Sequence, residues 1–336
     1  MAKKIRLADI AENAGVSTAT VSRVLNGKST VAPQTRQAVL TALDLLGYER
    51  PEKLRLRPGG LVGLVVPELS NPIFPAIVQE LEDELAKNSY TPLLCTQSAG
   101  GTTEDQYVSM LIDQHVAGII FVSGLHADTT ADIDRYLNLS EIGIPYVFIN
   151  GWNPNIDAPD FSTDDRSAMK QAVRHLVSAG HTRVAFATGP SRFRTSQEKI
   201  AGYTDAISEL LPDEDPRVIT TLFTVEGGQM AATQLIDEGY TGIICGSDIM
   251  ALGAIRAAQR AGKRVPEDVS IIGFDDSPIM AFTSPPLTSL HQPITKIAAM
   301  AVSTLIAMIG GSAQPPVSMT FEAELIARES TARSPQ

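Results

Sequence analysis

Residues 11–30 read AENAGVSTATVSRVLNGKST, and this stretch decides the architecture at the start of the chain. Gly15 can adopt the positive φ that a sharp turn requires. Ser17 can cap the next helix by accepting a backbone N–H. The helix that follows, residues 18–25, collects apolar side chains on one side: Val21, Val24 and Leu25. A glycine turn followed by a short, capped, one-sided helix predicts a helix-turn-helix.

Two further helices are expected to complete a three-helix head over residues 1–49. The first covers residues 7–14, where apolar side chains recur at spacings of three and four. The other begins at Pro33, which suits the first turn of a helix. It runs to Leu46, and Gly47 is the type of residue that follows a helix end.

The second helix of this head directs four side chains outward: Thr18, Ala19, Ser22 and Arg23. An arginine can donate two hydrogen bonds to O6 and N7 of a guanine in the major groove. Short polar side chains that suit phosphate oxygens flank them: Ser17, Thr20 and Asn26. An isolated pattern of this kind is equally compatible with a capped surface helix whose arginine is merely solvated.

Charge is divided unevenly between this head and the rest of the chain. Residues 1–60 carry ten Lys and Arg against five Asp and Glu, a net charge of +5, whereas the whole chain carries −11. The remainder therefore carries −16. A small basic head on a large acidic body favours a nucleic-acid reader with a separate body.

The overall composition excludes several protein classes. Hydrophobic residues make up 43% of the 336 residues, which is enough to build buried cores and excludes a disordered chain. Two cysteines, Cys95 and Cys245, exclude a disulfide scaffold. The first residues contain no apolar run of signal-peptide length, and no stretch approaches a membrane span. We therefore expect a cytoplasmic protein that does not cross a membrane.

Residues 50–60 are expected to form a linker, because Pro51, Pro58 and the pair Gly59-Gly60 interrupt the pattern there. Short apolar runs then alternate with amphipathic helices. Runs without inside–outside alternation are typical of parallel strands covered on both faces. Residues 61–330 therefore predict an α/β fold of doubly wound parallel sheets, long enough for two lobes with a ligand cleft between them.

The expected strands are 61–66, 92–95, 118–122, 146–149, 184–187, 218–223, 242–245 and 270–274, with a last one at 322–327. The expected helices include 73–86, 167–179, 228–237, 249–260 and 294–309.

Motifs along nearly the whole chain resemble the LacI/GalR (lactose/galactose repressor) family. In the head they are Asp9-Ile10-Ala11, Ala14-Gly15-Val16-Ser17 and the run TVSRVLN at 20–26. In the body they include Asn71-Pro72-Ile73-Phe74, Gly180-His181, Gly189-Pro190, Ala201-Gly202-Tyr203, Ser247-Asp248 and Gly273-Phe274-Asp275-Asp276. The resemblance implies a helix-turn-helix head on a two-lobed core like that of periplasmic binding proteins. It also implies a ligand-responsive transcriptional regulator, most simply a repressor.

The resemblance assigns DNA-binding roles by position. Thr18 and Ala19 stand where the family reads its operator, and Arg23 stands where it contacts a base. The positions that contact the DNA backbone in the family are Ser17, Thr20, Asn26, Thr35 and Tyr48. Leu56 is the candidate for the leucine that the family inserts into the minor groove. This linker is shorter than usual.

The resemblance also assigns an effector site of ten residues: Phe74, Asn150, Phe193, Thr195, Lys199, Phe223, Ser247, Asp248, Asp275 and Gln292. Phe74 and Phe223 would flank the ligand, although each could equally pack in a core. Asp275 matches the family's main effector carboxylate. Lys199 stands where the family usually carries an arginine, and a lysine lacks the bidentate fork. Carboxylate and amide groups facing an aromatic wall suit hydroxyls, which favours a sugar or polyol.

Further expectations concern organisation and partners. The N-lobe should comprise about 61–161 and 289–318, the C-lobe about 162–288 and 319–330, and the tail 331–336. That tail is too short and polar for a coiled coil, so we expect a homodimer on a near-palindromic, double-stranded DNA operator. No cofactor is expected.

Two other function classes remain as alternatives. A small-molecule binding protein of sugar-binding type, without a DNA role, would not need the basic head. An α/β enzyme would need a catalytic constellation, but no G-x-S-x-G, H-E-x-x-H or G-x-G-x-x-G motif occurs. The five histidines show no metal-ligand spacing. Acidic pairs such as Asp164-Asp165 and Asp275-Asp276 suit helix capping and ligand binding better than catalysis. We expect neither an enzyme nor a metal site.

Overall fold

The computed structural model describes residues 6–25, 31–46, 59–97, 100–312, 315 and 317–335. The chain divides into two compact units, residues 1–59 and residues 60–336. Each unit is described by itself.

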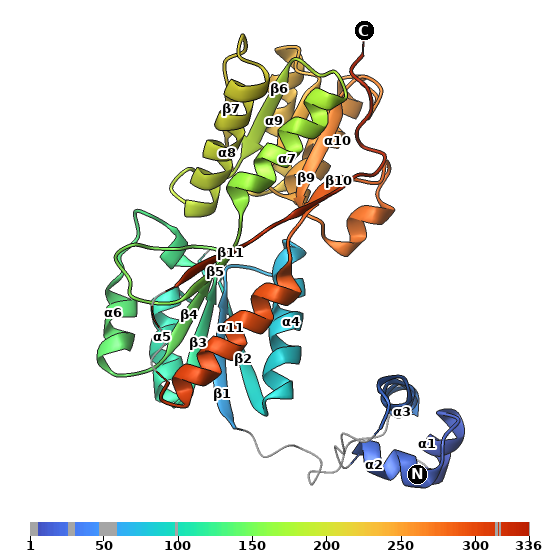
Figure 1. Ribbon diagram of the computed structural model, residues 1–336, viewed down its shortest axis with the longest axis vertical. Coiled ribbons are helices and arrows are strands. Elements are labelled where there is room, and N and C mark those ends of the chain that lie inside the picture. Colours follow the sequence, from blue (N-terminus) through green and yellow to red (C-terminus); the bar gives the residue numbers. More distant parts are fainter. Residues whose placement is uncertain are drawn as a thin grey trace. The chain divides into compact units, whose positions relative to one another are not determined.

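The first unit contains the three predicted helices (Figure 1): α1 (Leu7–Asn13), α2 (Thr18–Leu25) and α3 (Pro33–Leu46). Its core consists of seven buried side chains: Ile10, Ala11, Val21, Val24, Val39, Ala42 and Leu43. Gly15 takes a φ of +64° in the turn before α2. The Ser17 hydroxyl accepts a hydrogen bond from the Thr20 backbone N–H at 3.1 Å, which caps α2 as expected.

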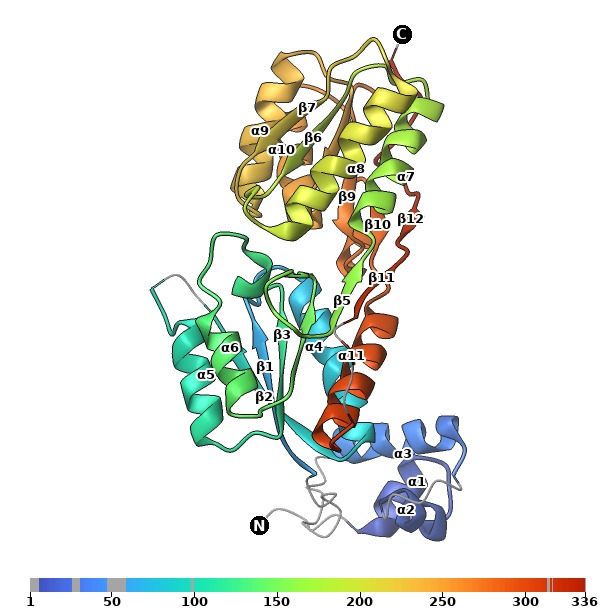
Figure 2. The same ribbon diagram turned by 60° about the vertical axis from the view of Figure 1, so that its left-hand side comes forward.

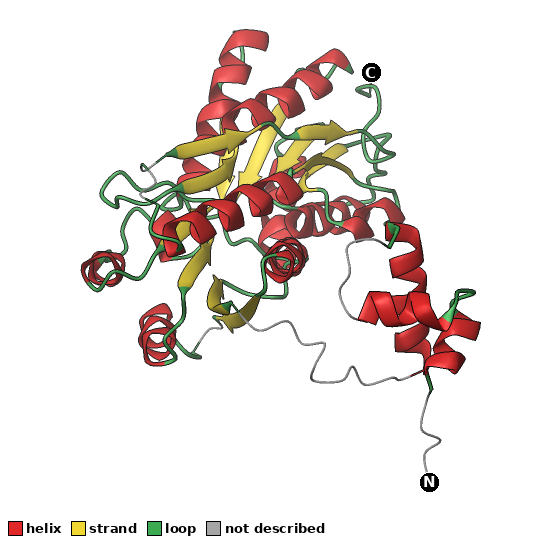
Figure 3. Ribbon diagram, turned by 60° about the horizontal axis from the view of Figure 1, so that its bottom comes forward, coloured by secondary structure: helices red, strands yellow, loops and turns green. Residues whose placement is uncertain are grey.

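The second unit contains two six-stranded sheets, one in each lobe (Figure 3). In the N-lobe the strand order is β11-β5-β4-β3-β1-β2, and every neighbouring pair is parallel. The strands are β1 (Gly60–Val66), β2 (Tyr90–Thr96), β3 (Gly118–Val122), β4 (Tyr146–Ile149), β5 (Asp160–Thr163) and β11 (Ser318–Phe321). All residues of β3 and β4 are buried, as parallel strands covered on both faces require.

Helices cover both faces of the N-lobe sheet (Figure 2). Apolar side chains of α4 (Ile73–Lys87) and α11 (Ile294–Ile309) form one core with the sheet. Those of α5 (Glu104–Asp113) and α6 (Asp134–Glu141) form another. A short 3₁₀-helix, η2 (Leu125–Ala127), follows β3.

The C-lobe repeats this plan with the strand order β12-β10-β9-β8-β6-β7, in which only the β10–β12 pair is antiparallel. The strands are β6 (Val184–Thr188), β7 (Arg217–Thr220), β8 (Gly242–Cys245), β9 (Ser270–Asp275), β10 (Thr288–His291) and β12 (Glu324–Ile326). The helices are α7 (Asp165–Ser178) and α8 (Arg194–Leu210) on one face, and α9 (Val225–Asp237) and α10 (Asp248–Arg260) on the other. A 3₁₀-helix, η3 (Pro278–Phe282), follows β9.

The chain passes between the lobes from β5 to α7, from β10 to α11 and from β11 to β12 (Figure 1). Each crossing comes a few residues later than the boundaries 161/162, 288/289 and 318/319 expected from the sequence. The sequences of β5, β10 and β11 are DFST, TSLH and SMTF. They mix polar with apolar residues, so no apolar run marks these strands. The strand expected over 322–327 is present as the shorter β12, and β11 precedes it as an additional strand.

The C-terminal residues pack on the C-lobe. The Thr331 hydroxyl lies 2.9 Å from His175 Nε2, the Ala332 N–H donates to Ser270 Oγ at 3.1 Å, and the Ser334 N–H donates to Ala179 O. The segment expected as a tail therefore contributes hydrogen bonds to this lobe. Within the described ranges, no helix is both long enough and apolar enough to cross a membrane.

Candidate functional site

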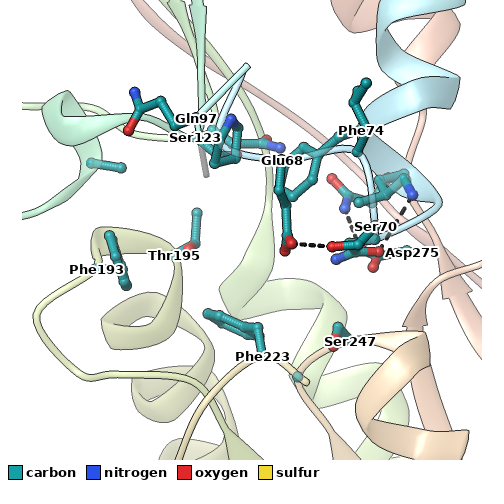
Figure 4. Close-up of a pocket in the computed structure, with 18 of the residues that line it drawn as sticks. Glu68, Ser70, Phe74, Gln97, Ser123, Phe193, Thr195, Phe223, Ser247 and Asp275 are labelled. Atoms are coloured by element: carbon teal, nitrogen blue, oxygen red, sulfur yellow. Dashed lines mark hydrogen bonds between the residues drawn. The ribbon is translucent and has the colours of Figure 1, made fainter. Parts of the chain in front are cut away.

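A cavity of about 790 Å³ opens between the two lobes, at the carboxyl ends of their strands (Figure 4). Ligands of open α/β sheets bind at this edge. Nine of the ten residues expected at an effector site line it: Phe74, Asn150, Phe193, Thr195, Lys199, Phe223, Ser247, Asp275 and Gln292. They come from segments distant in the sequence, and only the pairing of the lobes brings them together.

The first residue of α7 and the second turn of α8 contribute an ion pair to the cavity wall. Lys199 Nζ lies 3.1 Å from Asp165 Oδ1, and each side chain is only 7% exposed. Lys199 Nζ also lies 3.8 Å from the centroid of the Phe274 ring. Burial raises the pKa of Asp165, while the neighbouring lysine acts against that rise. The positive charge in this wall is therefore already engaged.

Asp275, the last residue of β9, presents a carboxylate to the cavity. Gln292 Nε2 donates to Asp275 Oδ1 at 2.6 Å, and Gln292 Oε1 accepts from Thr163 Oγ1 at 2.8 Å. Asp275 Oδ2 is buried and has no protein partner. Burial, together with the nearby Asp248 carboxylate, raises the pKa of Asp275 well above its ordinary value. A buried acceptor without a partner is costly, so this oxygen is suited to a ligand hydroxyl.

Left-handed backbone at strand ends turns polar side chains towards the cavity. Ser123 after β3, Asn150 after β4 and Asp275 have φ values of +47°, +60° and +115°. Such values are uncommon for residues other than glycine and concentrate at functional sites. All three residues line the cavity.

Aromatic rings supply the apolar part of the wall. Figure 4 places Phe193 and Phe223 with Thr195 and Ser247 on one side of the cavity and Phe74 on the other. The Phe223 ring lies directly against Gly189, where an added Cβ would come within 2.0 Å of it. Gly189 therefore has no room for a side chain while this ring keeps its position.

Asp248 is the one expected effector residue that the structure does not place in the cavity wall. Its side chain is fully buried and does not line the cavity. Its Oδ1 accepts from Ser289 Oγ at 2.5 Å and its Oδ2 accepts from the Ser277 N–H at 2.7 Å. Burial raises its pKa to about 7. One oxygen therefore connects α10 to β10 and the other connects it to the turn after β9, so the Asp248 carboxylate serves contacts within the C-lobe.

Sequence reasoning missed several residues of the cavity wall, among them Glu68, Asn71, Gln97, Ser123 and Asp165. Asp165 adjoins Asp164, which caps α7 by accepting from the Ser167 N–H at 2.9 Å. The acidic pair is visible in the sequence, but capping explains only its first member. For the others, their positions after β1, β2 and β3 are the available signal.

The lobes also meet beside the cavity, in a rim contact that joins residues 128–129 to residues 192–197. Arg192 Nε donates to Asp128 Oδ2 at 2.7 Å. The Thr129 N–H and hydroxyl both donate to the Arg192 carbonyl oxygen, at 2.9 and 2.8 Å. Ala127, Phe193 and Thr195, which lie next to these residues, line the cavity.

The predicted DNA-binding side chains of the first unit lie on its surface. Ser17, Thr18, Ala19 and Arg23 are exposed, while Thr20, Ser22 and Thr35 are half-buried. The hydroxyls of Ser17 and Thr20 lie 2.9 Å apart. Three other expected residues, Asn26, Tyr48 and Leu56, lie outside the described residues, as does most of the expected linker 50–60.

The described residues contain no group of three or more His, Cys, Asp or Glu arranged to hold a metal ion. His181, one of the histidines considered above, is buried and its ring nitrogens lie within hydrogen-bond distance of Thr241, Ser270 and Ala332. Its contacts are those of a structural residue of the C-lobe.

Comparison with known proteins connects these two units to one kind of protein. The model of bacterial regulatory proteins of the lacI family matches residues 6–51, and that of the periplasmic binding protein-like domain matches residues 173–331. The HTH-type transcriptional regulator MalR of Streptomyces coelicolor is 54% identical over 335 residues, covering 98% of this chain and 97% of MalR.

Two solved structures resemble both units. A complex of the transcriptional regulator CelR with cellobiose has a TM-score of 0.69 and 30% identity, covering 97% of this chain and 99% of that one. The Lac repressor dimer bound to operator and the anti-inducer ONPF has a TM-score of 0.70 and 25% identity, covering 98% and 100%.

Proposed function

This chain belongs to the LacI family of bacterial regulatory proteins, and we propose that it represses transcription as a homodimer whose hold on a near-palindromic operator is controlled by a neutral sugar or polyol in the interlobe cavity. It is a ligand-responsive, DNA-binding transcriptional regulator. The single observation that carries the effector proposal is the Asp275 carboxylate, which belongs to the cavity wall and whose buried Oδ2 has no protein partner.

The DNA-binding role is proposed to reside in a head of residues 1–49, joined by a hinge of residues 50–60. Thr18, Ala19 and Arg23 stand exposed on α2, where they can enter a major groove. Two-fold symmetry would place two such helices about one helical turn apart, ~34–36 Å. The Lac repressor neighbour was solved as a dimer on its operator, which supports this arrangement. Operator binding would also place the protein in the cytoplasm.

The effector class is supported by the chemistry of the cavity. Asp275 can accept hydrogen bonds from neighbouring hydroxyls, Asn150 can donate and accept, and Phe223 can cover the apolar face of a sugar ring. The CelR neighbour holds cellobiose, which is such a molecule. We propose no catalytic role, because the relatives are transcriptional regulators.

The test has two arms. DNA from the region upstream of the gene is titrated with the protein by fluorescence anisotropy, with and without sugars, polyols and purines. We expect tight, sequence-dependent binding that at least one sugar or polyol changes. Light scattering at micromolar protein should give the mass of a dimer. A stable tetramer, or a purine as the best ligand, would contradict the corresponding part of the proposal.

A further inference from the structure

The cation of the cavity is neutralised within the protein. Asp165 on α7 and Lys199 on α8 form a 3.1 Å ion pair, and both side chains are 7% exposed. The Phe274 ring, 3.8 Å from Nζ, occupies another side of the ammonium group. Because its charge is already engaged by a carboxylate and an aromatic ring, this lysine attracts an anionic ligand only weakly.

The other charged groups of the cavity are acidic. Among the described residues that line it, Glu68, Asp165 and Asp275 carry carboxylates, whereas Lys199 is the single cation. Two arginines lie close to this wall along the chain, but neither is among the residues that line the cavity: Arg192 pairs with Asp128, and Arg194, whose buried Nε has no hydrogen-bond partner, lies over the Trp152 ring at 5.2 Å. The described part of this cavity therefore provides no unpaired positive charge.

We propose that Asp165 is a specificity-determining residue, which neutralises Lys199 and so makes the cavity accept uncharged sugars while rejecting phosphorylated and acidic ones. This inference rests on the proposed sugar effector and narrows its chemical class. An anionic ligand would meet the partnerless oxygen of Asp275 with no free cation nearby. Like charges placed together are an effective means of rejecting a wrong ligand, and burial strengthens the repulsion because the local dielectric is low.

Protonation of Asp275 does not reverse this selectivity. Burial raises the pKa of Asp275, so this side chain holds its proton to a higher pH than an exposed aspartate. The protonated form removes a negative charge from the cavity, but it adds no positive one. The two negative charges of a phosphate would still have no cation to pair with. The free-energy cost of removing their hydration would therefore stay uncompensated.

The experiment uses ligand pairs that differ only in charge: glucose with glucose 6-phosphate, ribose with ribose 5-phosphate, and cellobiose with its 6′-phosphate. Inorganic phosphate is a further probe. Affinities are measured by calorimetry at constant ionic strength on the full chain. In any pair that binds, the uncharged member should bind at least about 100-fold more tightly, because the phosphate is repelled.

Asp165→Asn tests the residue itself. It removes the charge but keeps the shape, which frees Lys199, so the preference should fall by about tenfold and inorganic phosphate should begin to bind. The double variant Asp165→Asn/Asp275→Asn should reduce the preference for the uncharged sugar further and bind inorganic phosphate more tightly.

Asp205→Asn is the matched control. Asp205 on α8 pairs with Lys170 on α7 at 3.6 Å and with Arg166 at 3.1 Å, but it lies outside the cavity and its side chain is 42% exposed. This variant should keep the discrimination of the parent, whereas a general effect of removing charge between α7 and α8 would change it.

The outcomes separate this inference from the proposed function. If the parent binds a sugar phosphate as tightly as the uncharged sugar, the inference is overturned. If Asp165→Asn keeps the parent's discrimination and still rejects phosphate, the role of Asp165 is overturned. If no uncharged sugar binds, but the parent rejects phosphate and Asp165→Asn binds it, the charge selectivity is supported while the sugar effector fails.

Discussion

The head and the cavity of this protein use their functional residues in opposite ways. In the head, Thr18, Ala19 and Arg23 are exposed within six positions of one helix. None of them belongs to the seven-residue core of the head. In the cavity, Asp275 and Gln292 are buried, bond to each other and tie the two lobes through Thr163. Substitutions at the head surface should therefore affect binding alone, whereas substitutions in the cavity should affect binding and stability together.

The largest expected effect removes the head while leaving the cavity intact. Leu43 on α3 is buried in the small head core, so Leu43→Ala should cost about 2–5 kcal/mol and unfold a head this size. DNA binding should be lost, while calorimetric effector affinity stays unchanged. Leu45→Ala on the same helix is the control, because that side chain is 73% exposed. Parallel loss of effector binding would show that the two regions are not independent.

The free-energy cost of burying a carboxylate in the body can be measured from the pH dependence of unfolding. Burial raises the pKa of Asp160 to about 6 from 3.8. Between about pH 4 and pH 6 the folded chain then binds more protons than the unfolded chain, so this group makes the free energy of unfolding fall as pH rises, by about 3 kcal/mol.

Asp160→Asn cannot titrate and should flatten this fall. Urea unfolding at pH 4 and pH 7, followed through the single tryptophan, Trp152, reports on the body alone. Part of the fall in the free energy of unfolding with rising pH should remain in this variant, because burial also raises the pKa of Asp248. An unchanged slope would contradict the assignment to Asp160.

Asp275→Asn sharpens the comparison at the cavity. Losing a charge-assisted acceptor should weaken effector binding by about 1.5–3 kcal/mol, roughly 10–150-fold. DNA affinity without effector should be nearly unchanged, since the head is a separate unit. Calorimetry and anisotropy on the same preparation measure both quantities. A variant that binds its ligand as well as the parent would contradict the assigned role.

Arg23→Ala is the corresponding change in the head. It should cost about 1–3 kcal/mol of operator affinity and relax the preference at one base pair in each half-site. Because Arg23 is exposed, thermal stability should not change. The check is a set of operators with single substitutions, titrated by anisotropy. Unaltered affinity and preference would contradict the helix-turn-helix role of this arginine.

The smallest expected effect concerns the rim contact. Arg192 is half exposed, and such pairs contribute about 0.2–1 kcal/mol. Arg192→Gln should therefore weaken effector binding by no more than about fivefold, because closure of the lobes loses one ion pair. Arg217→Gln, which breaks a pair with Glu238 inside the C-lobe, should leave effector affinity unchanged. Equal effects of the two variants would show that the rim contact has no special part in binding.

The head and most of the regular elements were predictable because their signals are local. The glycine turn at Gly15, the cap at Ser17 and the spacing of Val21 and Val24 describe α2 within a few residues. Apolar runs likewise identified buried strands such as β3 and β8. The strands β5, β10 and β11 escaped prediction, because short strands of mixed polarity are recognisable only from the partners they pair with.

The cavity shows the limit of local signals. Residue type and family position pointed to Asp275 and Lys199, but the same reasoning placed Asp248 in the cavity and overlooked Asp165. Asp248 and Asp275 are both acidic residues at the carboxyl side of a strand, so the sequence treats them alike. Only the tertiary structure shows that Ser277 and Ser289 occupy both oxygens of Asp248, while one oxygen of Asp275 is left without a partner.

By itself, the sequence determined the class of the protein: a basic three-helix head, an acidic two-lobed α/β body, and the residue types of each site. Periodicity, capping and charge depend on residues that are close together in the chain, so they can be recognised from the sequence alone. The tertiary structure alone decided which charges meet. The pairing of Asp165 with Lys199 joins two helices that approach each other only after both lie against the C-lobe sheet. Desolvation and ion pairing depend on distances in space. The charge that the cavity presents to a ligand is therefore set by the tertiary structure.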